Sequence, residues 1–532
     1  MTMLSTMMGK RVFRGFRTWA LLLLGVVATD AAEIDPKSAP VVNVTGGAVR
    51  GAGLSSGGGV FRGVPFAAPP VGPRRWQPPQ PVVPWSGIRE ALKPGPPPAQ
   101  VSFEWDRELA AAGHEDCLYL DVWSPDLGPR TPKPVMVWIH GGANLSLAGG
   151  WEPVYEGWQI VTQDVVLVVL EYRLGVFGFM AHPGLTGESP HHASGNYGLL
   201  DQIAGLRWVR ENIRAFGGDP ENVTVFGQSA GSWDIMALMS SPLARGLFQR
   251  AILQSGVPPP SVTRSLADSE KAGEAMAARA NAPVQDTVKF LRSLTAEQVI
   301  AAGEGLNLFT QDGWVLPATP STVWARRQEQ PVPVIIGGNA SEFPAQGGLP
   351  ELRAAMKDWF GELAPAAWKL YGISGDKEPP VDPIYGDVRD QWGSDLSFRI
   401  PGILHGEWHQ AAGNRVWQYE FDRAIAPHPR VQHSSELAYV FGNLLRRGGM
   451  VSGEFDAADH RLSDVMLGYW TNFAKNGDPN GAGLPAWPQF EPAGRRFMRF
   501  TQVAEAVSDA RQRADFVELF RRRLEQDVNP KK

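Results

Sequence analysis

The chain has 532 residues, of which 43% are hydrophobic and 20% are charged, and its net charge is −5 at pH 7. This composition supplies a buried core and excludes a disordered chain, while the acidic balance argues against nucleic acid as a partner. Cys117 is the only cysteine, so an internal disulfide and a cysteine-rich metal site are both excluded. No interior linker or repeat is visible, and we expect one globular unit over residues 33–532.

The first 32 residues differ in character from the rest of the chain. Four basic residues between positions 10 and 17 precede an apolar stretch at 19–27, and small residues follow at 28–32. This pattern is typical of a cleaved secretory signal, and its apolar part is short for a membrane span of about 20 residues. An uncleaved membrane anchor is the alternative. We therefore expect a bacterial secreted or periplasmic protein with no integral membrane span in the mature chain.

Strands and helices alternate along the middle of the chain. Continuous apolar runs at 134–140 and 164–170 predict strands that are buried on both faces. Apolar residues spaced by three and four predict a helix over 198–216, which the Phe-Gly-Gly-Asp-Pro segment ends. Further strands are predicted at 223–226, 250–254 and 332–336. This alternation predicts an α/β fold with a parallel sheet.

Two long segments, 256–324 and 347–404, carry helix-like patterns without clear strands. We predict that they are helical lid or cap insertions on the α/β unit.

A serine stands at a predicted strand-to-helix turn. The sequence Gly-Gln-Ser-Ala-Gly at 227–231 follows the strand at 223–226 and precedes a helix-like segment. Its two glycines permit a sharp turn that holds Ser229 in strained geometry with an exposed hydroxyl, so Ser229 is the predicted nucleophile. A second Gly-x-Ser-x-Gly match at 53–57 has no strand before it and no helix after it, and we predict a flexible turn there.

A serine nucleophile needs a histidine that accepts its proton and a carboxylate that orients the histidine. Among the histidines that follow the serine, His433 closes a loop just before the apolar segment 437–441 and is the first candidate. His428, between two prolines, is the next. His405 and His409 lie four residues apart in a helix-like segment, which favours a solvated helix face.

Glu342 is the predicted acid. It follows the predicted strand at 332–336 after a Gly-Gly-Asn-Ala-Ser segment, which places it on a loop beyond the strand's carboxyl end. Open α/β sheets build their sites at this edge. The alternative is an ordinary N-cap or surface glutamate.

An oxyanion that develops when a serine attacks a carbonyl group needs backbone N–H donors. The His-Gly-Gly-Ala turn at 140–143 follows a strand and offers glycine amides without obstruction by side chains. Gly142 and Ala230, the residue after the nucleophile, are the predicted donors, with Gly141 as a third. An ordinary glycine loop is the alternative.

Together with other segments, these motifs resemble the type B carboxylesterase and cholinesterase-like family of α/β-hydrolases. The resemblance covers nearly the whole chain after residue 32. It rests on FRGVPF at 61–66, EDCLYL at 115–120, HGG at 140–142, YRLGVFG at 172–178, GNYGLLDQ at 195–202, FGGDP at 216–220, GQSAG at 227–231 and HSSELAYVFG at 433–442. It implies a central, mostly parallel sheet flanked by helices, with helical cap insertions.

The resemblance also implies site residues. A Ser, Glu, His triad falls on Ser229, Glu342 and His433, in agreement with the residues taken alone. Ser255 matches a serine that supports the catalytic glutamate. Gln228 stands where many members carry a glutamate beside the nucleophile, which argues against a pocket for quaternary ammonium.

Structural roles follow from the same resemblance. Ion pairs are expected between Arg75 and Glu115 and between Arg173 and Asp201. Cys117 occupies a position that often forms a disulfide, but no partner cysteine is present, so we expect a buried, inert thiol.

These observations predict a serine carboxylesterase that cleaves small-molecule esters through an acyl-enzyme, with no metal or organic cofactor. A non-catalytic binding protein of the same family is one alternative, and the presence of nucleophile, acid, base and oxyanion loop argues against it. A lipase-type enzyme for long-chain esters is the other, and it lacks the support of a strongly apolar lid. The pattern carries no prediction of acyl length or oligomeric state.

Overall fold

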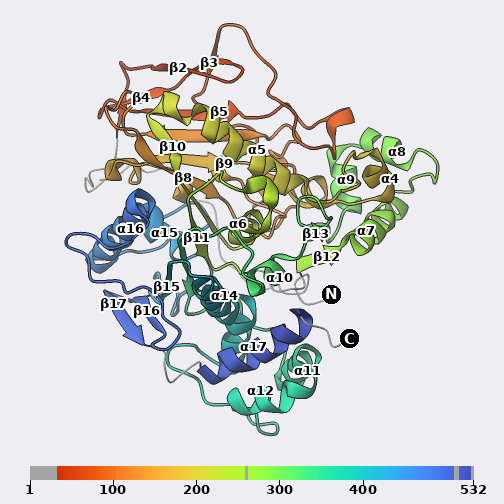
Figure 1. Ribbon diagram of the computed structural model, residues 1–532, viewed down its shortest axis with the longest axis vertical. Helices are drawn as coiled ribbons and strands as arrows, with labels where there is room; N and C mark the ends of the chain where they lie inside the picture. The colour runs from red at the N-terminus through yellow and green to blue at the C-terminus, as the bar shows by residue number, and fades with distance from the viewer. Residues whose placement is uncertain (1–32, 105, 258–261, 509–513, 529–532) are drawn as a thin grey trace.

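A 12-stranded sheet forms the centre of the protein (Figure 1). The computed structural model describes residues 33–104, 106–257, 262–508 and 514–528, so the predicted secretory signal lies outside the described residues. In sheet order the strands are β1 (Ile34–Asp35), β4 (Ala52–Leu54), β5 (Gly59–Pro65), β7 (Tyr119–Ser124), β9 (Val166–Leu170), β8 (Lys133–Ile139), β10 (Gly218–Gln228), β11 (Arg250–Gln254), β14 (Val334–Asn339), β15 (Val416–Phe421), β16 (Arg496–Phe500) and β17 (Ala504–Ser508).

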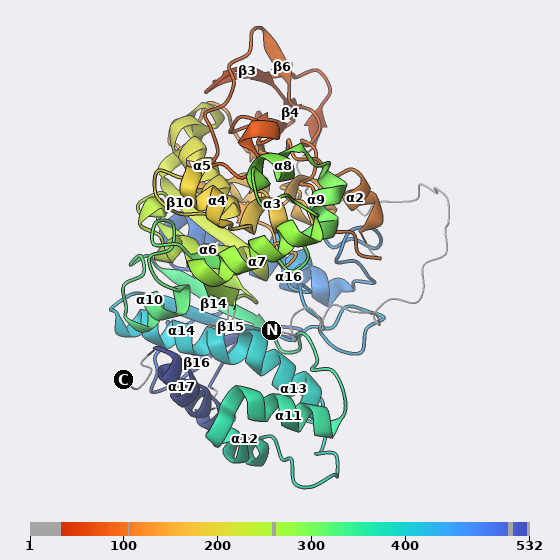
Figure 2. The ribbon, with the colours of Figure 1, turned by 90° about the vertical axis from the view of Figure 1, so that its right-hand side faces the viewer.

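The strands from β9 to β16 pair in parallel, and the pairs at both ends of the sheet are antiparallel. This mixed, mostly parallel sheet with helices on its faces confirms the predicted α/β class. A second sheet contains β2 (Val41–Val44), β3 (Gly47–Arg50) and β6 (Ile88–Glu90). It lies at one end of the molecule, opposite helices α11, α12 and α17 (Figures 1 and 2).

Helices follow most of the central strands. Those before β14 are α2 (Arg107–Ala111), α3 (Gly175–Phe179), α4 (Pro183–Glu188), α5 (Tyr197–Asn212), α6 (Ala230–Ser240), α7 (Leu266–Arg279), α8 (Thr287–Ser293), α9 (Ala296–Ala302) and α10 (Pro320–Ala325). Those after it are α11 (Leu349–Phe360), α12 (Ala364–Leu370), α13 (Val388–Ser394), α14 (Ile400–Ala411), α15 (Leu437–Phe441), α16 (Ala457–Asn476) and α17 (Ala514–Val528). None of the helices in the described ranges has both the length and the apolar character needed to cross a membrane.

Strand β8 shows why the continuous apolar runs form central strands. Val135, Val137 and Ile139 face the core beneath α5 and α6, while Met136 and Trp138 face the core beneath α15 and α16. Successive side chains of a strand point to opposite faces, so a strand that is covered on both sides needs apolar residues throughout.

Strand β14 extends beyond its predicted end, through Gly337 and Gly338 to Asn339. A Cβ atom on Gly337 would lie 2.3 Å from the carbonyl oxygen of Tyr419 on β15. The glycine therefore permits a close approach of two strands and does not mark a loop.

Two expectations about short strands need correction. The Gly-x-Ser-x-Gly match at 53–57 begins inside strand β4 and forms the turn between β4 and β5. The segment 256–324 contains two short paired strands, β12 (Thr263–Ser265) and β13 (Phe309–Gln311), among its helices.

His405 and His409 are buried, so the prediction of a solvated helix face is wrong. Their helix, α14, lies between the sheet and helices α10 and α17. The ring of His409 is held by Glu329 Oε1, 2.6 Å from Nδ1, and by the carbonyl oxygen of Val332, 2.8 Å from Nε2. Both histidines therefore lie in the interior, and His409 is fixed there by hydrogen bonds.

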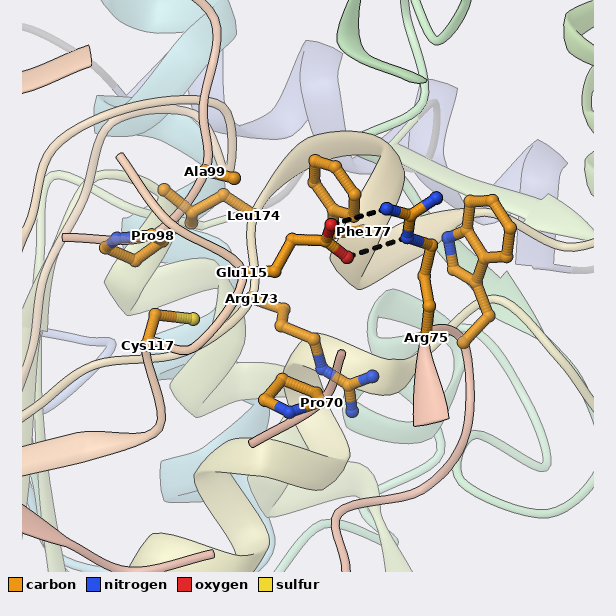
Figure 3. A pocket seen from close by; sticks show the side chains of 10 residues that line it. Pro70, Arg75, Pro98, Ala99, Glu115, Cys117, Arg173, Leu174 and Phe177 are labelled. Carbon is orange, nitrogen blue, oxygen red and sulfur yellow. Dashed lines mark hydrogen bonds and ion pairs between the residues drawn. The ribbon is translucent and has the colours of Figure 1, made fainter. Parts of the chain in front are cut away.

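Both expected ion pairs are present. Arg75 Nε and Nη2 lie 2.7 and 2.5 Å from the two carboxylate oxygens of Glu115 (Figure 3). Arg173 Nε and Nη2 each lie 2.7 Å from a carboxylate oxygen of Asp201. Cys117 is buried beside these pairs, and burial raises the pKa of its thiol well above the ordinary value. A thiol that stays protonated is unreactive, as expected.

Candidate active site

Ser229 occupies the turn between strand β10 and helix α6. Its backbone angles are φ 57° and ψ −124°, which is a strained conformation for a residue with a side chain. A Cβ atom on Gly231 would lie 2.0 Å from the carbonyl oxygen of Ile139, and one on Gly227 would lie 2.8 Å from the backbone of Gly231. Glycine is therefore required on both sides of the serine, and Ser229 itself remains half-buried.

Glu342 and His433 meet through a short hydrogen bond, with Glu342 Oε2 2.6 Å from His433 Nδ1. The glutamate side chain is fully buried, while the histidine side chain is 13% exposed. Both lie on loops, one after β14 and one just before α15. No side-chain hydrogen bond joins His428, the second candidate base, to Glu342 within the described ranges.

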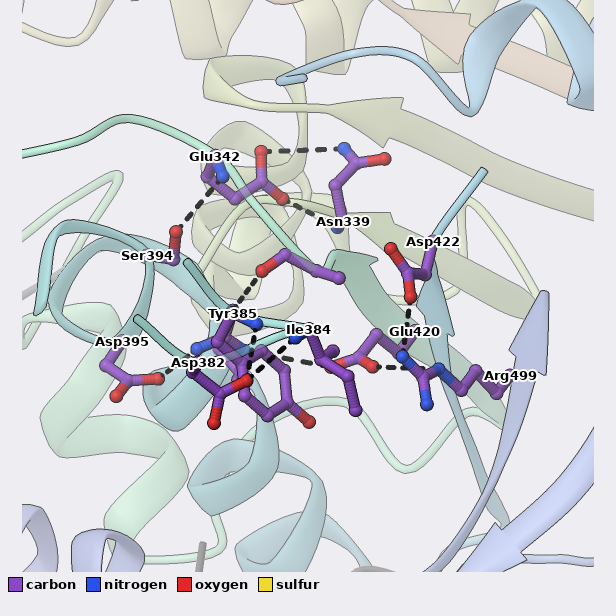
Figure 4. A network of polar contacts seen from close by, with 12 residues as sticks. Asn339, Glu342, Asp382, Ile384, Tyr385, Ser394, Asp395, Glu420, Asp422 and Arg499 are labelled. Carbon is purple, nitrogen blue, oxygen red and sulfur yellow. Dashed lines mark hydrogen bonds and ion pairs between the residues drawn. The ribbon is translucent and has the colours of Figure 1, made fainter. Parts of the chain in front are cut away.

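Further polar groups hold the Glu342 carboxylate in place. Its Oε1 accepts hydrogen bonds from Ser255 Oγ and from the backbone N–H of Asn339, both at 2.7 Å. The backbone N–H of Glu342 in turn donates to Ser394 Oγ at 3.0 Å (Figure 4). These contacts fix the position of the carboxylate.

A second carboxyl group lies behind the first. Asn339 Nδ2 donates to Glu436 Oε2 at 2.8 Å and lies 3.5 Å from Glu342 Oε2. Burial, and secondarily the nearby charge of Glu342, raise the pKa of Glu436 to about 7. Sequence reasoning missed both residues, although Glu436 lies only three positions after His433, on the same turn that leads into α15.

Gln228 contacts the other nitrogen of the imidazole. Its Nε2 lies 3.1 Å from His433 Nε2. Because the Nδ1 proton is directed at Glu342, Nε2 is the unprotonated nitrogen and accepts from the Gln228 amide. No hydrogen bond joins Ser229 Oγ to His433 among the residues that the structure describes.

Two aromatic rings flank the imidazole. The Phe398 ring stacks on His433 with centroids 5.2 Å apart, and the Phe343 ring lies 4.3 Å away. These rings restrict the rotation of His433 and shield its contact with Glu342 from water. The sequence analysis identified neither residue. Phe343 lies in the loop after β14 and Phe398 in the helical segment Asp395–Arg399, and a single apolar side chain in either place carries no distinctive pattern.

The glycine loop that follows β8 lies directly beside the nucleophile. A Cβ atom on Gly141 would be 3.1 Å from Ser229 Cβ. Within the described part of the chain, the amides of Gly141 and Gly142 donate to no other group. Ala230 is the first residue of α6, and first-turn amides have no partner inside their helix. All three predicted oxyanion donors are therefore near Ser229 with N–H groups to offer.

A buried network lies behind this loop. Tyr172 Oη is 2.8 Å from the carbonyl oxygen of His140 and 3.1 Å from Asn144 Oδ1, and Asn144 Nδ2 is 3.0 Å from Asp234 Oδ1. Burial raises the pKa of Asp234 to about 7. The sequence analysis did not identify these residues as part of the site. In the described ranges, no group of three or more His, Cys, Asp or Glu side chains is arranged to hold a metal ion.

The architecture defines a class of protein. A strained serine between a parallel strand and a helix, a histidine–carboxylate pair and a glycine loop all lie at the carboxyl edge of one α/β sheet, which is the arrangement of an α/β-hydrolase.

Comparison with known proteins agrees with this assignment to the α/β-hydrolases. The model of the Carboxylesterase family matches residues 38–347 and 385–517. Fumonisin B1 esterase from Sphingopyxis macrogoltabida is 35% identical over 509 residues, which cover 91% of each chain. Carboxylesterase 1E from Rattus norvegicus is 34% identical over 539 residues, with 89% of this chain and 92% of the relative covered.

Solved structures show the same similarity. A PNB esterase superimposes with a TM-score of 0.76 at 32% identity, covering 91% of this chain and 99% of its own. A carboxylesterase from Geobacillus stearothermophilus gives a TM-score of 0.73 at 33% identity. The chain belongs to the carboxylesterase family and is a carboxylic ester hydrolase.

Proposed function

We propose that the protein is a serine carboxylesterase in which Ser229 is the nucleophile, His433 the base and Glu342 the residue that orients the base. The main support is the 2.6 Å contact between Glu342 and His433, on the same sheet edge as the strained Ser229 turn. Catalytic contacts are often long or unformed in free enzymes, so an unmade Ser229–His433 hydrogen bond is compatible with this role.

The reaction follows from these positions. His433 Nε2 takes the Ser229 proton as Oγ attacks the ester carbonyl carbon, while the Nδ1–H remains on Glu342. The resulting oxyanion accepts hydrogen bonds from the amides of Gly141, Gly142 and Ala230. His433 then gives its proton to the departing alcohol, which leaves an acyl group on Ser229. Water, deprotonated by the same imidazole, then attacks the acyl carbonyl. The bond from the acyl carbon to Ser229 Oγ breaks, Oγ takes the proton back from His433, and the carboxylic acid is released.

Gln228 has a part in the first step. Its amide occupies the nitrogen that must receive the serine proton, so it keeps Nε2 unprotonated while the site is empty. On substrate binding, the Ser229 hydroxyl replaces the amide at this nitrogen.

The experiment is hydrolysis of p-nitrophenyl esters that are graded in acyl length, measured for the wild type and for Ser229→Ala. We expect the substitution to lower kcat by a factor of about 10⁴ to 10⁶. Ser55→Ala is the matched control, because Ser55 belongs to the other Gly-x-Ser-x-Gly match and lies exposed in the β4–β5 turn. Equal turnover by Ser229→Ala and the wild type would refute the proposal.

The same panel addresses the substrate class. A short-acyl optimum is expected for a carboxylesterase, whereas rising rates toward long acyl chains would indicate a lipase. Fumonisin B1 belongs on the panel, because a relative that is 35% identical is named as its esterase.

We also propose that residues 1–32 act as an export signal and that the mature enzyme is secreted or periplasmic. The basic, apolar and small-residue pattern of this segment supports the proposal. The test is N-terminal sequencing of the protein from the cell envelope and medium of a bacterial host. Retention of residue 1 in exported protein, or protein found only in the cytoplasm, would contradict it.

A further inference from the structure

The two peptide groups of the oxyanion loop are each held by their carbonyl oxygen. Tyr172 Oη donates to the carbonyl oxygen of His140 at 2.8 Å, and His140 Nδ1 lies 2.9 Å from the carbonyl oxygen of Gly141. In a trans peptide the carbonyl and the following N–H point to opposite sides. The first contact therefore directs the N–H of Gly141, and the second directs the N–H of Gly142.

The second contact fixes the proton of His140. Because a carbonyl oxygen only accepts, Nδ1 must carry the hydrogen that it donates to Gly141. A neutral His140 then has a lone pair at Nε2. The ring also stacks on Tyr172, with centroids 4.6 Å apart, so its orientation is set by packing as well.

Glu171 faces this lone pair. His140 follows β8 and Glu171 follows β9, and the adjacent residues Ile139 and Leu170 are paired in the sheet. His140 Nε2 and Glu171 Oε2 are 3.6 Å apart, and both residues are buried. Among the described residues neither atom has a hydrogen-bond partner. The other carboxyl oxygen, Oε1, accepts from the N–H of Gly150 at 2.7 Å.

Two assignments of protons satisfy both atoms. A protonated Glu171 donates its O–H to Nε2 of a neutral His140, or an ionised Glu171 accepts from the Nε2–H of a doubly protonated His140. An ionised Glu171 beside a neutral His140 would place a negative oxygen against a lone pair. A separation of 3.6 Å exceeds an ordinary hydrogen bond, so the contact requires a rotation of one of the two side chains. Two unsatisfied buried atoms would otherwise cost stability.

The surroundings favour the neutral pair. Burial lowers the pKa of His140 to about 4 and raises the pKa of Glu171 to about 8. The backbone N–H groups of Gly150 and Gly149 oppose the rise in the pKa of Glu171, as does the Arg62 charge, while the Asp121 carboxylate adds to it. Burial therefore favours the uncharged forms of both residues over an ion pair between them.

We propose that Glu171 is a positioning residue whose protonated carboxyl group donates to His140 Nε2, holds His140 in the Nδ1–H tautomer and so aims the Gly142 N–H at the oxyanion. The catalytic part of this inference rests on the proposed function, because the oxyanion forms only if Ser229 attacks an ester. The arrangement of protons does not depend on that function.

Two substitutions at Glu171 separate a hydrogen-bond donor from a charge. Glu171→Gln keeps the length, the acceptor for Gly150 and a donor for His140, and we expect kcat within about threefold of wild type at pH 7. Glu171→Met keeps the length and removes the donor. Because loss of an oxyanion donor costs about 10²- to 10³-fold, and a misdirected one costs less, we expect kcat to fall about 10- to 100-fold with KM changed less than threefold.

The kinetic outcomes decide the proposal. Equal losses in both variants would overturn it, because they would show that the carboxylate charge is required. Full kcat in Glu171→Met would overturn it as well. Wild-type protein that lacks Ser229-dependent turnover would instead refute the proposed function, and the proton assignment would then be tested by the spectroscopic measurement alone.

The second measurement uses ¹⁵N-histidine-labelled wild-type protein and NMR of the imidazole nitrogens, with His140 assigned by its loss in His140→Gln. We expect a protonated Nδ1 and an unprotonated, hydrogen-bonded Nε2 at pH 7. A protonated Nε2 would overturn the proposal. This NMR measurement uses the wild-type protein, so it tests the proposal even if Glu171→Met fails to fold.

Discussion

Replacing Ser255 by alanine removes one of the two hydrogen bonds on Glu342 Oε1. Ser255 Oγ lies 2.7 Å from this atom, and the Asn339 N–H at the same distance remains. Asn339 Nδ2 also loses a contact of 3.3 Å with Ser255 Oγ but keeps its 2.8 Å contact with Glu436. The carboxylate should therefore stay in place with one donor fewer.

The size of the effect follows from what changes during the reaction. A hydrogen bond to a charged group is worth about 1.5–3 kcal/mol, which corresponds to a factor of about 10 to 150 in rate if all of it is lost in the transition state. Ser255 Oγ donates to Glu342 both before and during the reaction, so only the part of this hydrogen bond that grows as His433 becomes a cation affects the rate. We therefore expect kcat/KM for a short p-nitrophenyl ester to fall about tenfold in Ser255→Ala.

Ser463→Ala is the matched control. Ser463 is also buried, and its Oγ donates to the carbonyl oxygen of Tyr439 at 3.0 Å, within the packing of α15 and α16. We expect a loss of about 1 kcal/mol in the free energy of unfolding and a kcat/KM within twofold of wild type. If Ser255→Ala also stays within twofold, or if it loses more than about 10³-fold, the supporting role assigned to Ser255 is wrong.

Further predictions concern neighbouring positions. Gln228→Glu places a negative charge beside His433, and this charge favours the imidazolium. The acidic limb of the pH profile of kcat/KM should therefore move to higher pH. An unmoved limb would contradict the contact between residue 228 and His433. Gly231→Ala brings a Cβ atom to 2.0 Å from the carbonyl oxygen of Ile139. Thermal melting should show that the free energy of unfolding falls by about 3 kcal/mol or more, and turnover should be lost. A wild-type melting curve would contradict the turn geometry. Burial raises the pKa of Glu436 from 4.5 to about 7, so stability present below pH 4.5 is lost as the pH rises through 7. Relative to Glu436→Gln, the wild type should lose on the order of 3 kcal/mol between pH 4.5 and 8 in urea unfolding, and parallel pH dependences would contradict this.

The central strands were predictable because they are buried on both faces. The run at 250–254 coincides with β11, and the helix at 198–216 with α5 and the short 3₁₀ turn after it. The antiparallel strands at the N-terminal end, such as β4 and β5, were not predicted. β4 has only three residues, and β5 contains two glycines and pairs with β7, which is distant in the sequence.

The candidate site also contains residues that the sequence predicted and residues that it did not. Ser229, Glu342 and His433 lie beside turn residues and strand ends, which leave a pattern in the sequence. Residues such as Glu171 contribute through burial against a neighbouring loop, and their roles depend on the register of β8 with β9. A single sequence does not specify that register.

The most direct test of Ser229 as the nucleophile is covalent labelling with an alkyl phosphonate, followed by mass spectrometry of the digested protein. The account predicts one phosphonate per chain on the peptide that contains Ser229, with turnover lost in proportion to labelling. A label on another serine, or full turnover by completely labelled protein, would contradict it.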